Sequence, residues 1–138
     1  MSDSTPGAEE HAHDPEVLQL AARAFDLARS GATGTLAAYI DAGVPADLAD
    51  DEGDTLVMLA AYRGHPDTVA ALLHRGADPN RPNDRGRTPL AGAVLKDDSA
   101  VVEVLLGAGA DPAAGTPSAL DTARRFGRKE MLRLFGAS

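Results

Sequence analysis

The sequence contains no cysteine, and aromatic residues make up only 4% of its 138 residues. The absence of cysteine excludes disulfide bonds and thiolate catalysis. With few aromatic side chains and much alanine, the chain has to build its core from small residues packed closely together. This composition favours helices stacked face to face, and the length corresponds to a single domain.

Long apolar runs are also missing, since no stretch approaches the roughly 18 apolar residues that would indicate a membrane span. The first fourteen residues are polar and acidic, the reverse of a secretory signal peptide. We therefore expect a cytoplasmic protein that does not insert into a membrane. Lysine is scarce beside arginine, alanine and glycine, a composition typical of GC-rich bacterial genomes.

Basic residues are outnumbered, with 13 Lys and Arg against 21 Asp and Glu, and the formal net charge is -8. Binding to nucleic acid and attachment to anionic membranes both need a basic surface, so the charge argues against these two functions. Mimicry of nucleic acid by the acidic segments stays open as an alternative.

Motifs of catalysis and metal binding are absent as well. The chain has no G-x-x-x-x-G-K-[ST] loop, no H-E-x-x-H and no G-x-S-x-G. His11 and His13 lie in a polar tail that supplies no fixed geometry for a metal ion. We predict no catalytic residue, no metal ligand and no cofactor, and we do not expect an enzyme. A small enzyme or metal-binding protein stays open, because absent motifs do not exclude catalysis.

What the sequence does contain is a repeat with a period of 33 residues. When residues 50–82 are laid over residues 83–115, eleven of the 33 positions carry identical residues. Weaker matches continue one step toward the N-terminus and, after three residues are dropped, one step toward the C-terminus. A fixed period in this range is typical of a solenoid, whose end units diverge because they face water on one side.

Local signals within each repeat predict a turn followed by two short helices. Residues 51–53 form a turn whose glycine can adopt positive φ, and Thr55 and Thr88 are candidate helix N-caps. Gly76 is placed to end the second helix in the left-handed region, and Pro79 prevents the helix from continuing.

The stretches GDTLVMLAAYRGHPDTVAALLHRGADPN and GRTPLAGAVLKDDSAVVEVLLGAGADP resemble the ankyrin repeat, with its G-x-T-P-L-H-x-A-A-x-x-G-H and L-L-x-x-G-A-D-x-N phrases. Leu56 stands where the motif has proline, and Met58 and Ala91 stand where it has a histidine that ties neighbouring loops together. In the third unit, Asp97 and Asp98 replace the Gly-His between the helices.

This resemblance covers roughly residues 16–136. It implies an all-α solenoid of about four helix-turn-helix units with short β-hairpin-like loops, in which the outer units act as caps. We expect a disordered acidic tail over residues 1–15 and a repeat domain over residues 16–138. The units are expected at about 16–49, 50–82, 83–113 and 114–136.

The resemblance also implies a non-catalytic protein-binding module, since small bacterial ankyrin proteins commonly serve as accessory proteins or regulators of another protein. The family contacts its partners with the hairpin tips and the exposed part of each first helix. On the first helices of this chain, the contact positions fall at Arg29, Tyr62, Arg63, Leu95, Lys96, Arg125 and Phe126. This basic strip with two aromatics predicts a groove for an acidic or phosphorylated segment of a partner protein. The alternative is that long polar side chains only solvate an exposed helix face.

The hairpin tips carry further candidate contact residues, and the charges of the two tips have opposite signs. The first tip has Asp51, Glu52 and Asp54, and the second has Arg85 and Arg87. This separation of charge would orient an approaching partner. The alternative is a modest attraction between neighbouring tips, worth at most about 1 kcal/mol for exposed pairs.

We expect a monomer, although self-association stays open as a structural function. Leu132 and Phe135 close the last unit, and a cap with little polar surface would pair with a second copy. Arginines and Lys129 around these two residues make the same surface charged, which argues against pairing.

Overall fold

The computed structural model of the chain describes residues 15–137, and this part consists of eight helices that follow one another as four pairs. The helices are α2 (Pro15–Ser30), α3 (Thr33–Asp41), α4 (Leu56–Tyr62), α5 (Pro66–His74), α6 (Pro89–Leu95), α7 (Ser99–Gly107), α8 (Ala119–Arg125) and α9 (Lys129–Leu134). None of the helices in this range combines the length and the apolar character needed to cross a bilayer. Helix α2 begins at Pro15, one residue before the expected start of the repeat domain.

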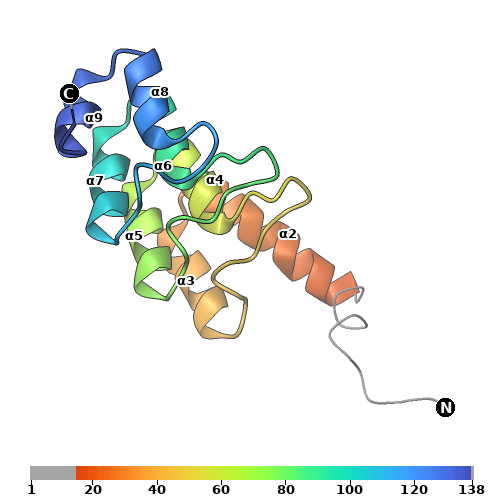
Figure 1. Cartoon of the computed structure of the whole chain (residues 1–138). Coiled ribbons are helices and arrows are strands. Elements are labelled where there is room, and N and C mark those ends of the chain that lie inside the picture. The colour runs from red at the N-terminus through yellow and green to blue at the C-terminus, as the bar shows by residue number, and fades with distance from the viewer. Residues whose placement is uncertain (1–14, 138) are drawn as a thin grey trace.

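The helices form two rows, because each helix packs against its counterpart in the next pair (Figure 1). We call α2, α4, α6 and α8 the inner row, and α3, α5, α7 and α9 the outer row. Each connection between pairs runs from the end of an outer helix to the start of the next inner helix, and all of these connections project on the same side of the stack. Strand pairing in residues 15–137 is limited to two isolated bridges, so the prediction of an all-α solenoid is confirmed.

The core lies between the two rows and is built mainly from alanine, valine and leucine. Every residue of α6 from Pro89 to Val94 is buried, because this helix has neighbours on both sides and behind it. Helices of the outer row bury one stripe only, such as Val69 and Leu72 in α5. Neither kind of helix could cover its apolar surface alone, which is why the units stack.

The local signals that the sequence contains are confirmed. Thr55 accepts a hydrogen bond from the Met58 N–H at 3.2 Å, and Thr88 caps the next inner helix in the same way. Gly53 and Gly76 have φ of 79° and 94°, values that side chains other than glycine rarely adopt. The turn and the helix end therefore lie where the residue types require them.

Polar links join consecutive units at positions one repeat apart. The Asp47 carboxylate accepts a hydrogen bond from the Asp78 N–H at 2.7 Å. One unit later, the Asn80 amide oxygen accepts from the Asp111 N–H, also at 2.7 Å. The recurrence of the same bond after 33 residues fixes the offset of each unit against the next.

A second link recurs between the helices of neighbouring units, with one exception. His65 Nε2 donates to the Arg29 carbonyl at 2.8 Å, and Arg128, at the equivalent position two units later, donates to the Leu95 carbonyl at 3.0 Å. Asp98 occupies this position in the unit between them. A carboxylate cannot donate, and Asp98 instead caps its own helix by accepting from the Val101 N–H at 3.1 Å.

Substitution of Thr55 by alanine tests whether the cap of α4 stabilises the stack. Thr55→Ala removes the acceptor for a buried N–H, and we expect the free energy of unfolding to fall by about 1 kcal/mol. Thr55→Ser keeps the hydroxyl and is the matched control. Urea denaturation followed by circular dichroism measures both variants, and equal losses in the two would show that the hydroxyl contributes nothing.

Candidate functional site

Three connections between the helix pairs project side by side from the inner row, and we call them the first finger (residues 49–55), the second finger (residues 82–88) and the third finger (residues 114–118) (Figure 1). The Asp84 N–H donates to the Glu52 carbonyl at 3.0 Å, which joins the second finger to the first. The Thr116 N–H donates to the Gly86 carbonyl at 2.9 Å, which joins the third finger to the second. The fingers therefore form one continuous edge.

Asn83 supplies much of the polar contact within and between the first two fingers. Its amide oxygen accepts from the N–H groups of Arg85 and Arg87 at 2.9 and 3.0 Å. Its amide nitrogen donates to the Asp54 carboxylate at 2.9 Å. Met58 and Ala91, which stand at the positions of the family's loop-tying histidine, are buried and have no side-chain donor to offer. The side-chain bond from Asn83 to Asp54 joins the second finger to the first.

The predicted contact residues of the middle inner helices lie on the open face of the inner row. Tyr62 is 37% exposed, and the Lys96 Nζ lies 4.7 Å from the centre of its ring. This cation–π contact holds a basic group and an aromatic ring together although they belong to different units. Arg63 is exposed at the C-cap of α4, and Leu95 is half-buried.

Two hollows lie along the edge formed by the fingers, and they contain most of the predicted residues. The first hollow, of about 220 Å³, is lined by Glu52, Asp54, Met58, Leu59, Tyr62, Asn83, Arg85 and Arg87. The second, of about 560 Å³, is lined by Arg87, Leu95, Pro117, Asp121, Thr122, Arg125 and Phe126. We call these the central hollow and the C-terminal hollow. Arg87 lines both, so the two hollows are neighbours on one face.

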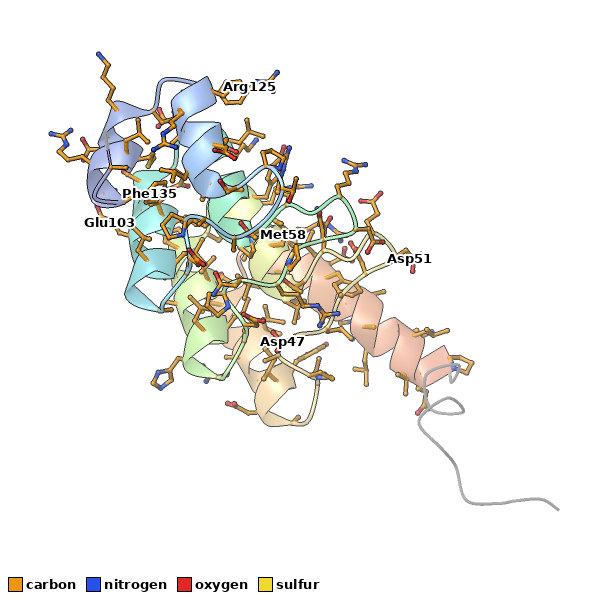
Figure 2. All side chains as sticks on the ribbon, in the orientation of Figure 1. Asp47, Asp51, Met58, Glu103, Arg125 and Phe135 are labelled. Carbon is orange, nitrogen blue, oxygen red and sulfur yellow. The ribbon has the colours of Figure 1, made fainter. Side chains whose placement is uncertain are left out.

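The C-terminal hollow combines an exposed aromatic ring with arginine side chains. Phe126 is 49% exposed, and the guanidinium carbons of Arg125 and Arg128 lie 5.9 and 5.8 Å from its ring centre. Arg128 also donates to the carbonyls of Val94 and Leu95, which fixes its side chain. Figure 2 shows Arg125 at the end of the inner row, on the side from which the fingers project.

Four predicted residues line neither of these hollows: Arg63 and Lys96, which lie next to Tyr62, and Arg29 and Asp51, which lie at the N-terminal end of the same face. Arg29 forms ion pairs with Asp26 at 3.0 Å and with Asp50 at 3.9 Å, so much of its charge is offset by its neighbours. Asp51 is exposed at the tip of the first finger, beside α2 (Figure 2). Both residues line a third hollow, of about 720 Å³, between α2 and the first finger.

Reasoning from the sequence missed an apolar surface on α2. Val17, Leu18 and Leu20 are 37%, 54% and 46% exposed. The signal was present in the stretch VLQLAA, residues 17–22, which carries leucine and valine where the next unit has the polar turn DDEGDT. An apolar stretch in place of a finger leaves leucine and valine side chains exposed to solvent in the described residues.

Metal binding finds no geometric support in residues 15–137, where no three His, Asp or Glu side chains are grouped closely enough to hold an ion. His11 and His13 lie outside the described residues, as do nearly all residues of the expected acidic tail. His65 serves the link to Arg29, and His74 is exposed in the last turn of α5.

Comparison with known proteins agrees with this geometry. The family model for ankyrin repeats, in three copies, matches residues 18–116. A Pseudomonas aeruginosa protein named as an ankyrin repeat protein is 44% identical over 54 residues, which are 39% of this chain and 32% of that protein. The matched segment thus spans about one third of that relative's length. The family resemblance inferred from the sequence is confirmed.

Replacement of Asn83 tests whether this residue holds the fingers. In Asn83→Ala, the Arg85 and Arg87 N–H groups lose their acceptor, and we expect their amide hydrogen exchange to speed up about fivefold or more, the effect of losing about 1 kcal/mol. Asn80→Ala is the matched control, because Asn80 bonds at the opposite end of the unit. Unchanged exchange at Arg85 and Arg87 would show that the backbone bonds alone hold the fingers.

Proposed function

The chain belongs to the ankyrin repeat family, and we propose that it is a non-catalytic, cytoplasmic protein-binding module that acts as an accessory or regulator of another protein. Ankyrin repeats are in general protein–protein interaction modules. What supports the proposal in this chain is the row of hollows along the fingers, which groups aromatic rings with basic side chains on one face.

We place the binding of an acidic segment at the central and C-terminal hollows. Arg85 and Arg87 stand on the finger side, whereas Lys96 and Arg125 stand on the inner helices. A segment that lies between these two sides would contact cations from both, and a carboxylate or phosphate there would accept charge-assisted hydrogen bonds. These basic side chains give only this part of the surface a positive charge, since the chain as a whole carries a net charge of -8.

The two aromatic rings supply the apolar part of this surface. Tyr62 and Phe126 are exposed by 37% and 49%, which leaves ring area that a partner would remove from water. Tyrosine and arginine are enriched among the residues that dominate binding energy in protein interfaces. Each ring is already held by a neighbouring cation, so little side-chain freedom is lost on binding.

Affinity capture from the source cell tests this surface. We expect Tyr62→Ala combined with Lys96→Glu to abolish capture of the partner, because one substitution removes the ring and the other reverses the charge above it. The matched control is Leu134→Ala combined with Lys129→Glu on α9. Leu134 is exposed by the same 37% as Tyr62, and Lys129 is the other lysine of the chain.

Circular dichroism of both double variants checks that their helical content equals that of the wild type. A protein that the wild type and the control variant capture, and the Tyr62, Lys96 variant does not, would be identified as the partner, and its binding site would be identified with it. Capture of the same proteins by all three forms would contradict the assignment of this face.

A further inference from the structure

The first unit has a helix where the other units have a finger. Helix α2 has 16 residues, whereas α4, α6 and α8 have 7 each. One repeat step of 33 places residues 17–22 at the positions of residues 50–55, which form the first finger. The stretch VLQLAA contains no glycine, proline or aspartate to make a turn, so the chain continues as helix through this region.

This extension of α2 forms a wall beside the first finger. Ala24 and Ala28 mark the side of α2 that is fully buried against the core. Earlier in the helix, Val17, Leu18 and Leu20 stay 37%, 54% and 46% exposed. Val17 and Leu18 line the hollow beside the first finger, whereas Leu20 lines, with Val17, a separate hollow between α2 and α3. Figure 1 shows α2 reaching past the other inner helices, with its N-terminal half standing clear of the stack.

The hollow between this wall and the first finger has an apolar side and an acidic side. We call it the N-terminal groove; its volume is about 720 Å³ and it is lined by Val17, Leu18, Ala21, Ala22, Phe25, Arg29, Leu48, Ala49, Asp50, Asp51 and Glu52. Arg29 is its one basic lining residue, and this guanidinium pairs with Asp26 and Asp50. The Asp51 and Glu52 side chains are exposed, and neither forms an ion pair with any group in residues 15–137.

We infer that the N-terminal groove is a docking site for a basic amphipathic segment of a partner protein. The apolar wall gains from removal of its leucine and valine side chains from water, which requires apolar side chains on the partner. The acidic rim requires lysine or arginine beside those side chains, because Asp51 and Glu52 would repel an acidic segment. The inference goes beyond the function proposed above, since none of the basic groups of that proposal lines the N-terminal groove; they are Arg85, Arg87, Lys96 and Arg125.

A second copy of this chain is a less suitable occupant of the groove. The described residues offer Phe126 with Arg125 and Arg128 as an exposed aromatic group flanked by cations. Arg128, however, uses its N–H groups to bind the carbonyls of Val94 and Leu95, so it is not free to reach an acidic rim. A separate partner segment meets both requirements without breaking these bonds.

Nuclear magnetic resonance of the full ¹⁵N-labelled chain tests the inference with a defined probe. The probe is a synthetic peptide of about 14 residues with leucine at i, i+3 and i+4 spacing and lysine elsewhere. We expect saturable shift changes in residues 17–25 and 50–52. A peptide with glutamate in place of lysine should produce none of these changes.

Variants of the apolar wall and of the acidic rim measure separately how much each side of the N-terminal groove contributes to the affinity for the peptide. Leu18→Ser should weaken peptide binding about tenfold, because Leu18 is the most exposed side chain of the wall. Asp51→Asn with Glu52→Gln should also weaken it about tenfold and should reduce its dependence on salt. The control for Leu18→Ser is Leu134→Ser, and the control for the acidic double variant is Glu103→Gln combined with Asp67→Asn. Both controls alter exposed residues of the outer row and should leave the affinity unchanged. Figure 2 shows Glu103 on the opposite side from Asp51.

Three results would overturn the inference. The first is shift changes spread over all acidic surfaces, including α5 and α7, which would indicate general charge attraction. The second is no saturable change in residues 17–25 and 50–52 up to about 1 mM peptide. The third is a dimer in light scattering that Leu18→Ser dissociates, which would identify a second copy as the occupant. None of these results depends on Tyr62 or Lys96. A failure of the inference about the N-terminal groove can therefore be distinguished from a failure of the proposed function.

Discussion

Each helix pair of this chain depends on the next pair, because a pair can bury only part of its apolar surface alone. The constraint that makes the stack regular is the fixed placement of each unit against the next, although the connection to the fourth unit is three residues shorter than the one before it. Side chains at equivalent positions hold this placement from both ends of the unit. Asp47 and Asn80 accept hydrogen bonds from the backbone of the turn that follows in the next unit. His65 and Arg128 donate hydrogen bonds to the end of the preceding inner helix. Where Asp98 cannot donate that bond, the stack is held by packing and by the fingers.

The fixed placement of the units also determines where a partner could bind. Since every unit leaves its outer helix in the same direction, the connections line up along one edge of the inner row. Hydrogen bonds between neighbouring fingers then turn separate loops into one surface with three hollows. Charge changes sign along this surface, from the carboxylates of the first finger to the arginines of the second finger and α8. A partner that follows the whole edge would need the complementary order of charges.

Much of the fold could be predicted from the sequence because its signals are local and recur. Thr55, Thr88 and Gly76 act through bonds or angles within a few residues, so their roles follow from residue type and spacing. The contact of Lys96 with Tyr62 could not be predicted in this way, because it depends on how two side chains from different units are directed. Arg29 shows the same limit: its position fitted a binding strip, and its pairing with Asp26 and Asp50 appears only in three dimensions. The helical extension of α2 could be predicted from its apolar stretch, but the exposure of its side chains follows only from how α2 lies against α3 and α4.

The proposed function requires that a partner binds the edge formed by the fingers and the inner row. Amide hydrogen–deuterium exchange of the full chain, measured with and without the captured partner, tests it most directly. We expect slower exchange on binding in residues 49–55, 82–88 and 114–118 and at the exposed ends of the inner helices, with no change in α5 and α7. Protection confined to the outer row, with the fingers exchanging as in the free chain, would contradict it.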